Sequence, residues 1–367
     1  MRRVTRRYFV LGISLALLAI GLLAALLLAA DGQIYTNVRM AILRYQLSNR
    51  SPELDASAGS VARPVRFHIP PGSSASAIAR ELADAGLIRD ADLFLDYARL
   101  EGYDRRFEAG VYFLNQTQSI RQIAEILTDS SKSFIAFRTP EGARIEELAE
   151  LINRNGLFGF QGADFLPLVD EGAPLPEEFA DWANIPPGAS LEGFMFPDTY
   201  QLPPDISAAG LRDMLLRAFQ DRVGNDLREE ALAQNLTLHQ VVALGSIIER
   251  EAVWRDEHPM IASVYRNRLD IGMKLEADPT VQYGIQGARG SWWPQITRAD
   301  YYDVQSPYNT YLHGGFPPGP IASPGLSAIQ AAIFPAESGF FYFRAACDNS
   351  HYHNFAVTFE EHVANGC

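Results

Sequence analysis

The stretch LHQVVALGSIIEREAVWRD, residues Leu238–Asp256, predicts one amphipathic helix around which the larger part of the chain is organised. On a helical wheel turning about 100° per residue, one apolar stripe contains Val241, Leu244, Gly245, Ile248 and Ala252. Glu249 falls inside that stripe, whereas Arg250 points away from it. Burial disfavours an ionised carboxyl group and raises its pKa, which suits a proton donor near neutral pH. The alternative is a structural carboxylate that pairs with an arginine or caps a loop.

Length and charge limit the classes of protein that fit. The chain has 367 residues, of which 47% are hydrophobic, and this is enough for about two or three domains. Its formal net charge of −13 argues against a nucleic-acid partner, because phosphate binding needs clustered Lys and Arg. The two cysteines, Cys347 and Cys367, form either one disulfide in an oxidising compartment or two unrelated thiols.

The N-terminus predicts a membrane anchor. Arginines within residues 1–7 precede an uncharged run, residues 8–30, that is long enough to cross a bilayer as a helix. The positive-inside rule puts residues 1–7 in the cytoplasm and the remaining chain outside. This predicts a single-pass protein of the inner (cytoplasmic) membrane whose folded part is extracytoplasmic or periplasmic. A signal peptide cleaved after Leu28-Ala29-Ala30 is the alternative. Residues 31–64 predict a linker or stalk.

The rest of the sequence predicts an α+β fold in two parts. These are a small α+β subdomain over residues 65–130 and a larger mixed α/β domain over residues 131–367. In the small part, Val65–Ile69 and Gly110–Leu114 alternate like strands. Helices are expected between the two strands, and Gly86 is placed to end the first of them.

The sequence also contains two similar segments. Ile69–Ile88 reads IPPGSSASAIARELADAGLI, and Thr139–Phe158 reads TPEGARIEELAELINRNGLF. Each copy predicts a Pro-x-Gly turn, a helix and a glycine stop, and Phe134–Arg138 is the strand that enters the second copy. Two copies do not make a solenoid, so we interpret them as a repeated supersecondary unit.

Motifs for common cofactors and metals do not occur in the sequence. It has no GxxxxGK[ST] or strand-linked GxGxxG, no HExxH and no GxSxG. His351 and His353 are only a weak metal signal, so we expect neither a cofactor nor a metal. Aromatic residues gather in LEGFMFPDTY, Leu191–Tyr200, and either line a sugar-binding groove or build a core. A carboxyl group on an apolar helix face, aromatic loops and a membrane tether together fit acid–base work on an extracytoplasmic polysaccharide.

Five stretches carry a more specific signal. They are LEGFMFPDTY (Leu191–Tyr200), SIIEREA (Ser246–Ala252), ASVYRNRLDIGMKLEADPTVQYG (Ala262–Gly284), YNTYLHGGFPPGPIASPG (Tyr308–Gly325) and YFRAACDNSHYHNF (Tyr342–Phe355). In this order, behind one N-terminal span, they resemble the YceG-like family of endolytic murein transglycosylases. The resemblance implies that residues 65–130 are a LysM-like subdomain and residues 131–367 a YceG-like catalytic domain.

The resemblance also implies roles for individual residues. It makes Glu249, the first acid of SIIEREA, the catalytic residue, and it gives Glu251 a supporting role. With the aromatic stretch included, the expected substrate-binding residues are Asn309, Tyr311, Gln282, Asp278, Glu251 and Tyr200. For Asn309, Tyr311 and Gln282 the alternative is a set of hydrogen bonds that shape loops. Phe316 replaces the usual leucine, a mild departure.

The implied activity is lytic cleavage within nascent peptidoglycan glycan strands. One carboxyl group protonates the oxygen between N-acetylmuramic acid and N-acetylglucosamine. It then takes the proton of the muramoyl C6 hydroxyl, which closes on C1 and leaves a 1,6-anhydro end. The expected partners are glycan strands, the membrane and peptidoglycan synthases, with no nucleic acid. The alternatives are a hydrolytic muramidase and a non-catalytic cell-wall scaffold that recruits synthases.

Overall fold

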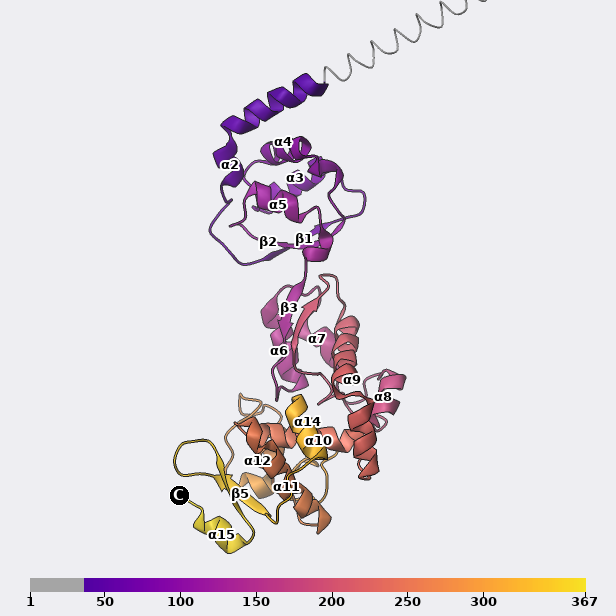
Figure 1. Ribbon diagram of the computed structural model, residues 1–367, viewed down its shortest axis with the longest axis vertical. Coiled ribbons are helices and arrows are strands. Elements are labelled where there is room, and N and C mark those ends of the chain that lie inside the picture. Colours follow the sequence, from indigo (N-terminus) through magenta and orange to yellow (C-terminus); the bar gives the residue numbers. More distant parts are fainter. Residues whose placement is uncertain (1–35) are drawn as a thin grey trace, which may run out of the picture. The chain divides into compact units, whose positions relative to one another are not determined.

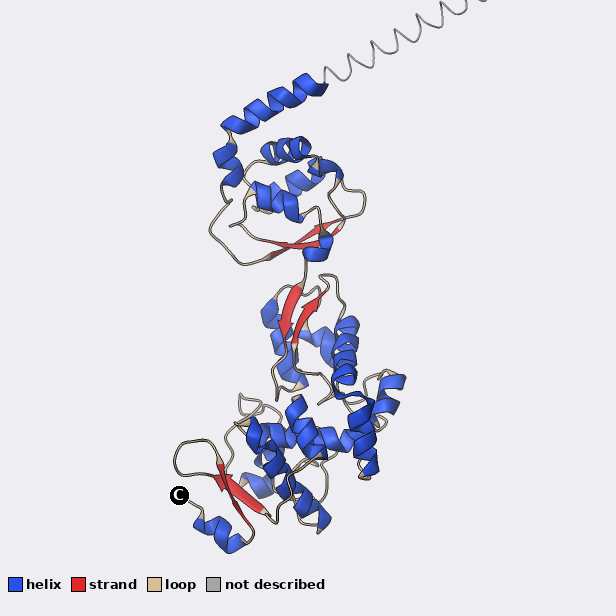
Figure 2. Ribbon diagram, in the orientation of Figure 1, coloured by secondary structure: helices blue, strands red, loops and turns tan. Residues whose placement is uncertain are grey.

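The computed structural model describes residues 36–367, which belong to two compact units, Met1–Ser133 and Phe134–Cys367 (Figure 1). The fold is a mixed α+β one, with helices and two-stranded antiparallel sheets in each unit, as predicted (Figure 2). The predicted cytoplasmic segment 1–7 and membrane helix 8–30 lie outside the described residues. Within the described part, no single helix is long and apolar enough for a membrane crossing. Only the bent pair Ala208–Ala233 and Leu238–Glu251, at 100°, meets those criteria jointly.

The N-terminal unit is built on one antiparallel strand pair and short helices. Its elements are α2 (Ser51–Asp55), β1 (Val65–Ile69), α3 (Ala75–Asp84), α4 (Ala91–Glu101), η1 (Tyr103–Arg105), β2 (Gly110–Leu114), α5 (Ile120–Ile126) and η2 (Ser130–Lys132). β1 pairs with β2 in a register that sets Phe67 opposite Tyr112. Because side chains alternate across a strand, Phe67 and Ile69 both point into the core with Tyr112.

Local signals explain where the helices of this unit begin and end. The Ser74 hydroxyl accepts the Ala77 N–H at the start of α3, and the Asp90 carboxylate accepts the Leu93 N–H at the start of α4. Such side chains satisfy the free N–H groups of a first helical turn. Gly86 and Gly102 follow the two helices with positive φ, 68° and 71°, a conformation that favours glycine.

The segment before β1 differs in part from the stalk predicted over residues 31–64. Residues 36–49 are helical, and α2 follows directly. Leu47 and Leu54 are 5% and 2% exposed and belong to the hydrophobic core of the unit. The two leucines lie in separate helices on either side of a turn at Arg50, and the average composition of the segment does not reveal that they are buried. Residues 56–64 contain no helix, and Ser57 forms an isolated bridge with Ser119.

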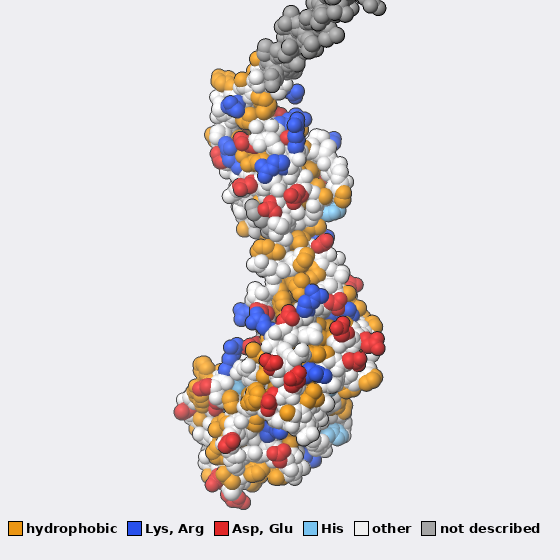
Figure 3. Space-filling view, turned by 45° about the vertical axis from the view of Figure 1, so that its right-hand side comes forward, with side chains coloured by type: hydrophobic (Ala, Val, Ile, Leu, Met, Phe, Trp, Pro, Cys, Tyr) orange, Lys and Arg blue, Asp and Glu red, His pale blue; other side chains and the backbone are white. Residues whose placement is uncertain are grey.

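The C-terminal unit is mostly helical. Its elements are β3 (Ile135–Arg138), α6 (Ile145–Asn155), α7 (Gly162–Phe165), η3 (Leu166–Leu168), α8 (Glu177–Ala183), β4 (Thr199–Leu202), α9 (Ala208–Ala233), α10 (Leu238–Glu251), η4 (Arg255–Glu257), α11 (His258–Asp270), α12 (Asp278–Gly284), α13 (Asp300–Asp303), α14 (Leu326–Ile333), β5 (Tyr342–Ala345), β6 (His353–Ala356) and α15 (Phe359–Ala364). β3 pairs with β4, and β5 pairs with β6, both antiparallel. On the face in Figure 3, acidic and basic side chains are interspersed with apolar ones.

Helix α10 is the centre of this unit. Thr237 and Gln240 form a capping box at its start, and every residue from Leu238 to Ile248 except Gln240 is buried. At Gly245 the helix lies against α14 (Figure 1), where a Cβ would stand 3.5 Å from the Ala328 backbone. The predicted helix continued to Asp256, but α10 ends at Glu251 and the chain turns through η4 into α11.

The two sequence copies fold as the predicted supersecondary unit, one in each of the two compact units. The first copy is β1, a turn and α3, and the second is β3, a turn and α6. Gly86 and Gly156 both have positive φ after their helices, 68° and 70°. Of the two states left open for the cysteines, the disulfide is the one formed: Cys347 is bonded to Cys367 across the β5–β6 hairpin and α15.

Candidate active site

Glu249 lies in the last turn of α10 and is half-buried. Its Oε2 accepts the backbone N–H of Gly325 at 2.9 Å, and Gly325 is the residue that precedes α14. Burial raises the pKa of Glu249, and the Gly325 hydrogen bond opposes that rise. Among the described residues, no arginine forms an ion pair with Glu249, so the structural pairing considered for it is not present there.

A turn from the second sequence copy lies beside Glu249. Gly142 N–H donates to the Ser323 carbonyl and Ser323 N–H donates to the Ala143 carbonyl, both at 2.8 Å. This small bridge brings Glu141 close enough for its negative charge to raise the pKa of Glu249. A Cβ on Gly325 would overlap the Glu141 carboxylate, so a larger residue there would push that carboxylate aside.

Arg255 completes the charge pattern around Glu249. Its guanidinium forms an ion pair with the Glu141 carboxylate, and its positive charge lowers the pKa of Glu249. Sequence reasoning missed both Glu141 and Arg255. They lie 108 positions before and 6 after Glu249 in the numbering. The Ala143–Ser323 bridge carries Glu141 to this site, and the ion pair joins Glu141 to Arg255.

Three predicted residues lie together on the other side of the end of α10. Glu251 accepts the Tyr265 hydroxyl at 2.7 Å, and Tyr311 donates its hydroxyl to Asp278 at 2.7 Å. Burial raises the pKa of Glu251 to about 7, the Tyr265 hydrogen bond opposes the rise, and the charge of Asp278 adds to it. Tyr311 also stacks on Tyr301 with ring centres 4.0 Å apart. The structure therefore brings Glu251, Asp278 and Tyr311 into one polar cluster.

Asn309 and Gln282 shape loops in this structure. Asn309 is 0% exposed, and its amide donates to the Tyr301 and Val304 carbonyls at 3.1 and 2.9 Å. Its Oδ1 accepts the Tyr311 N–H at 2.9 Å, so little of its hydrogen-bonding capacity is left. The Gln282 amide donates to the Pro294 carbonyl at 2.9 Å. For both residues the geometry favours the loop-shaping alternative over direct contact with sugar.

The aromatic stretch Leu191–Tyr200 packs into the core. Tyr200 is 9% exposed and donates its hydroxyl to the Phe196 carbonyl at 2.7 Å, which favours a structural role over the predicted sugar contact. The stretch contains Glu192, a carboxyl group that sequence reasoning passed over. Glu192 is fully buried, accepts the N–H groups of Ile145 and Gly193, and has its pKa raised to about 8 by burial.

The two histidines near the C-terminus differ in their surroundings. His353 Nδ1 lies 2.9 Å from a Glu257 carboxylate oxygen. His351 stands apart as an exposed residue with φ of 62°. Within residues 36–367, no group of three or more His, Cys, Asp or Glu residues is arranged to hold a metal ion.

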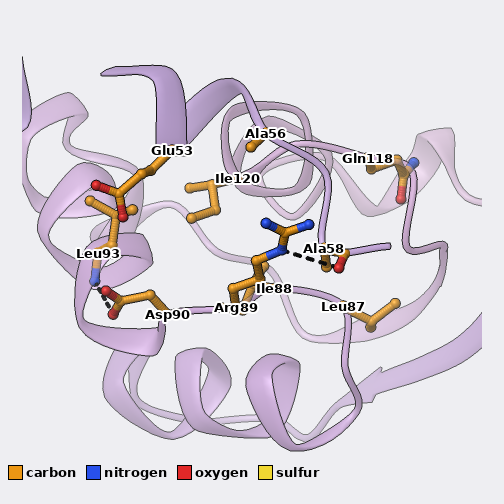
Figure 4. Close-up of a pocket in the computed structure, with 10 residues that line it drawn as sticks. All are labelled: Glu53, Ala56, Ala58, Leu87, Ile88, Arg89, Asp90, Leu93, Gln118 and Ile120. Atoms are coloured by element: carbon orange, nitrogen blue, oxygen red, sulfur yellow. Dashed lines mark hydrogen bonds between the residues drawn. The ribbon is translucent and has the colours of Figure 1, made fainter. Parts of the chain in front are cut away.

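A cavity of about 100 Å³ lies in the N-terminal unit (Figure 4). Its walls include Leu87, Ile88 and Ile120, and Arg89 donates from Nε to the Ala58 carbonyl at its edge. None of the site residues predicted from the sequence lines this cavity.

Comparison with known proteins covers most of the chain. Residues 67–366 match the model of the YceG-like family. The chain is 32% identical over 308 residues to the endolytic murein transglycosylase of Bacillus subtilis, covering 81% of this chain and 82% of that one. It is 28% identical to the protein of the same name from Streptococcus pneumoniae strain D39, covering 77% of this chain and 54% of that one. The chain thus spans about half the length of the pneumococcal relative. A solved structure of a yceG-like protein from Listeria monocytogenes is 31% identical, with a TM-score of 0.54, covering 82% of this chain and 98% of that one.

Proposed function

The chain belongs to the YceG-like family, and we propose that it is an endolytic murein transglycosylase that cleaves peptidoglycan glycan strands. The observation that carries this proposal is the state of Glu249 at the end of α10. It is a half-buried carboxyl group with a raised pKa and no arginine paired to it among the described residues. A raised pKa favours the protonated form of such a group, which is the form that can give a proton to a leaving oxygen.

The reaction uses one carboxyl group twice. Protonated Glu249 gives its proton to the oxygen that joins N-acetylmuramic acid to N-acetylglucosamine, and the C1–O bond breaks. The Glu249 carboxylate then accepts the proton of the muramoyl C6 hydroxyl as that oxygen bonds to C1. The products are a 1,6-anhydro end and a free N-acetylglucosamine end, and no water is consumed. Most glycosidases divide these tasks between two carboxyl groups.

The surroundings of Glu249 suit both of its protonation states. Burial and the negative charge of Glu141 favour the protonated acid that begins the reaction. The Gly325 N–H and the positive charge of Arg255 favour the carboxylate that forms after proton transfer. Glu249 therefore needs no large rearrangement to pass between general acid and general base.

The test is Glu249→Gln, assayed on purified glycan strands with mass spectrometry of the products. Gln retains an oxygen that can accept the Gly325 N–H, so we expect a folded protein whose release of anhydro-muropeptides falls by at least about 100-fold. Glu229→Gln, an exposed change on α9, is the matched control and should cleave like the wild type. Wild-type activity in Glu249→Gln would refute the proposal.

We also propose that the N-terminal unit is LysM-like and binds glycan. What supports this is the order β1, α3, α4, β2, with two helices between paired antiparallel strands. The unit has its own hydrophobic core, so residues 36–133 should fold alone. Chitooligosaccharide should then shift backbone NMR signals of that fragment, and a spectrum unchanged at saturating sugar would count against it.

For location, we propose a single-pass protein of the cytoplasmic membrane with both units outside. The uncharged run 8–30 behind the N-terminal arginines supports an anchor. The Cys347–Cys367 disulfide fits an oxidising compartment. Protease added to intact spheroplasts should digest the C-terminal unit, and protection of that unit would argue for the opposite orientation.

A further inference from the structure

Arg250 directly follows Glu249 on α10, and its hydrogen-bonding groups are unused. Its guanidinium carbon lies 3.8 Å from the centre of the Trp293 ring. The side chain is half-buried, and its Nε is buried with no hydrogen-bond partner. Among residues 36–367, no carboxylate forms an ion pair with it. A buried N–H donor without an acceptor is costly, so the Nε of this half-buried guanidinium favours a ligand that supplies oxygen acceptors.

Arg144 shows how the same fold treats an arginine with a structural role. It also packs against aromatic rings. Its guanidinium carbon lies 4.2 Å from the centre of the Tyr283 ring and 5.0 Å from the centre of the Trp292 ring. Its guanidinium, however, donates twice to Glu146, at 3.1 and 2.9 Å, and once to the Trp292 carbonyl at 3.4 Å. The donors of Arg144 are satisfied within the protein, whereas those of Arg250 are not.

The guanidinium of Arg250 is held in place although it lacks partners. Trp293 is fixed by a hydrogen bond from its Nε1 to Glu147 at 3.0 Å. Gly142 is also close to the side chain, since a Cβ there would stand 3.1 Å from Arg250 Cδ and 3.2 Å from Nη1. The charged groups that face Arg250 are Glu147, Glu249 and Glu251, and burial outweighs them in lowering the pKa of the guanidinium. Arg250 is therefore a positioned, partly desolvated cation beside the proton donor.

We propose that Arg250 binds the oxygen atoms of the D-lactyl group on the N-acetylmuramoyl ring at the scissile bond, which makes it a specificity-determining residue. The inference rests on the proposed function, because it places that ring beside Glu249. The lactyl group is the feature that separates the two alternating sugars, and it ends in a carboxylate or, when a stem peptide is attached, an amide carbonyl. A planar guanidinium fork matches two oxygens of this kind better than scattered hydroxyls.

A binding experiment in the Glu249→Gln background separates recognition from cleavage. The probes are a peptide-free tetrasaccharide of alternating N-acetylglucosamine and N-acetylmuramic acid, and an N-acetylglucosamine tetrasaccharide that lacks lactyl groups. We expect Glu249→Gln to bind the first more tightly by about 10- to 100-fold, the worth of a hydrogen bond to a charged group. Adding Arg250→Met should remove that preference and leave the affinity for the second probe unchanged. Arg250→Lys should retain part of it.

A control variant and kinetic measurements distinguish recognition of the lactyl group by Arg250 from an effect of Arg250 on the ionisation of Glu249. Arg154→Met, at a side chain 67% exposed on α6, is the matched loss of one positive charge and should keep the preference. With Glu249 intact, Arg250→Met should raise KM on glycan strands. Because the positive charge of Arg250 lowers the pKa of Glu249, the falling limb of the pH profile should also move to higher pH. A shifted pH profile with an unchanged preference would mean that Arg250 only tunes Glu249, and it would overturn the proposal.

Failure of the inference and failure of the proposed function give different results. If the wild type cleaves glycan strands and Arg250→Met cleaves them with the same KM, the inference is overturned and the function stands. If the wild type does not cleave, the proposed function falls, and the binding preference of Glu249→Gln still decides whether Arg250 recognises the lactyl group. Equal affinity for the two probes in that variant overturns the inference in either case.

Discussion

At the scale of single residues, burial is the main cause of the raised pKa of Glu249, and an ion pair of which Glu249 is not a member adjusts that pKa further. Glu141 and Arg255 bind each other, and their charges act on Glu249 in opposite directions. Glu249 must hold its proton to begin the reaction, so activity falls as the pH rises through its pKa. Each partner of the pair therefore shifts the alkaline limit of activity that burial of Glu249 mainly determines.

Changing either partner should move that limit in a known direction. Glu141→Gln removes the charge that raises the pKa of Glu249, so the falling limb of kcat/KM should move to lower pH. Arg255→Met removes the charge that lowers this pKa, so the limb should move to higher pH. The double variant should return toward the wild type, because the two residues are coupled. Shifts in the same direction for both single variants would contradict this account.

At the scale of elements, the contact between α10 and α14 holds Glu249 against the Gly325 N–H. Gly245 makes the contact close, since its Cβ position is 3.5 Å from the Ala328 backbone, an ordinary van der Waals distance. Gly325 stands immediately before α14, so any shift of α14 moves the donor that stabilises the Glu249 carboxylate.

Two substitutions of Gly245 should therefore behave differently. Gly245→Ala fits and gains helix propensity, so its free energy of unfolding should stay equal or rise by up to about 1 kcal/mol. Gly245→Val adds branched atoms that must displace α14, so it should cost about 1–3 kcal/mol and also lower kcat. Urea unfolding and glycan cleavage measure both effects. Equal losses of stability and of kcat in the two variants would show that α14 does not pack closely against Gly245.

The sequence predicts what depends on near neighbours. Helix starts at Ser74 and Asp90 and the stops at Gly86 and Gly156 follow from local chemistry, and the wheel of α10 placed Glu249 on the buried side. Glu141 lies far along the chain from Glu249, and pairing between distant segments leaves no periodic signal. For the aromatic stretch around Glu192 the sequence left a groove and a core as alternatives, and the stretch packs as core around a buried acid. The sequence also did not decide whether the Asn309 amide binds sugar or forms hydrogen bonds within its loop, and the structure shows the loop hydrogen bonds.

At the scale of the whole molecule, the two units are compact bodies, and the disulfide belongs to the second one. The Cys347–Cys367 bond closes a sequence separation of 20 residues. The hairpin that it ties contacts the segment after α10, since Trp254 Nε1 donates to the Ser350 carbonyl at 2.8 Å and His353 pairs with Glu257. The disulfide thus supports the region that carries Arg255.

Removing the disulfide should destabilise one unit only. In the chain-entropy account, a loop of this size contributes about 3 kcal/mol, so replacing Cys347 and Cys367 by Ser should lower the melting temperature of the C-terminal unit. Scanning calorimetry with and without reductant checks this, and the wild type in reductant should match the double variant. If the melting temperature of residues 36–133 fell by the same amount as that of the C-terminal unit, the division into two independent units would be contradicted.

The central claim is that a single carboxyl group closes a ring from the substrate's own C6 hydroxyl, so the most direct measurement follows the oxygen atoms. Purified glycan strands are digested in water enriched in ¹⁸O, and the new muramoyl ends are analysed by mass spectrometry. We expect 1,6-anhydro ends without label from the wild type and no new ends from Glu249→Gln. Reducing ends that carry ¹⁸O would show that water attacks C1, and they would contradict the account.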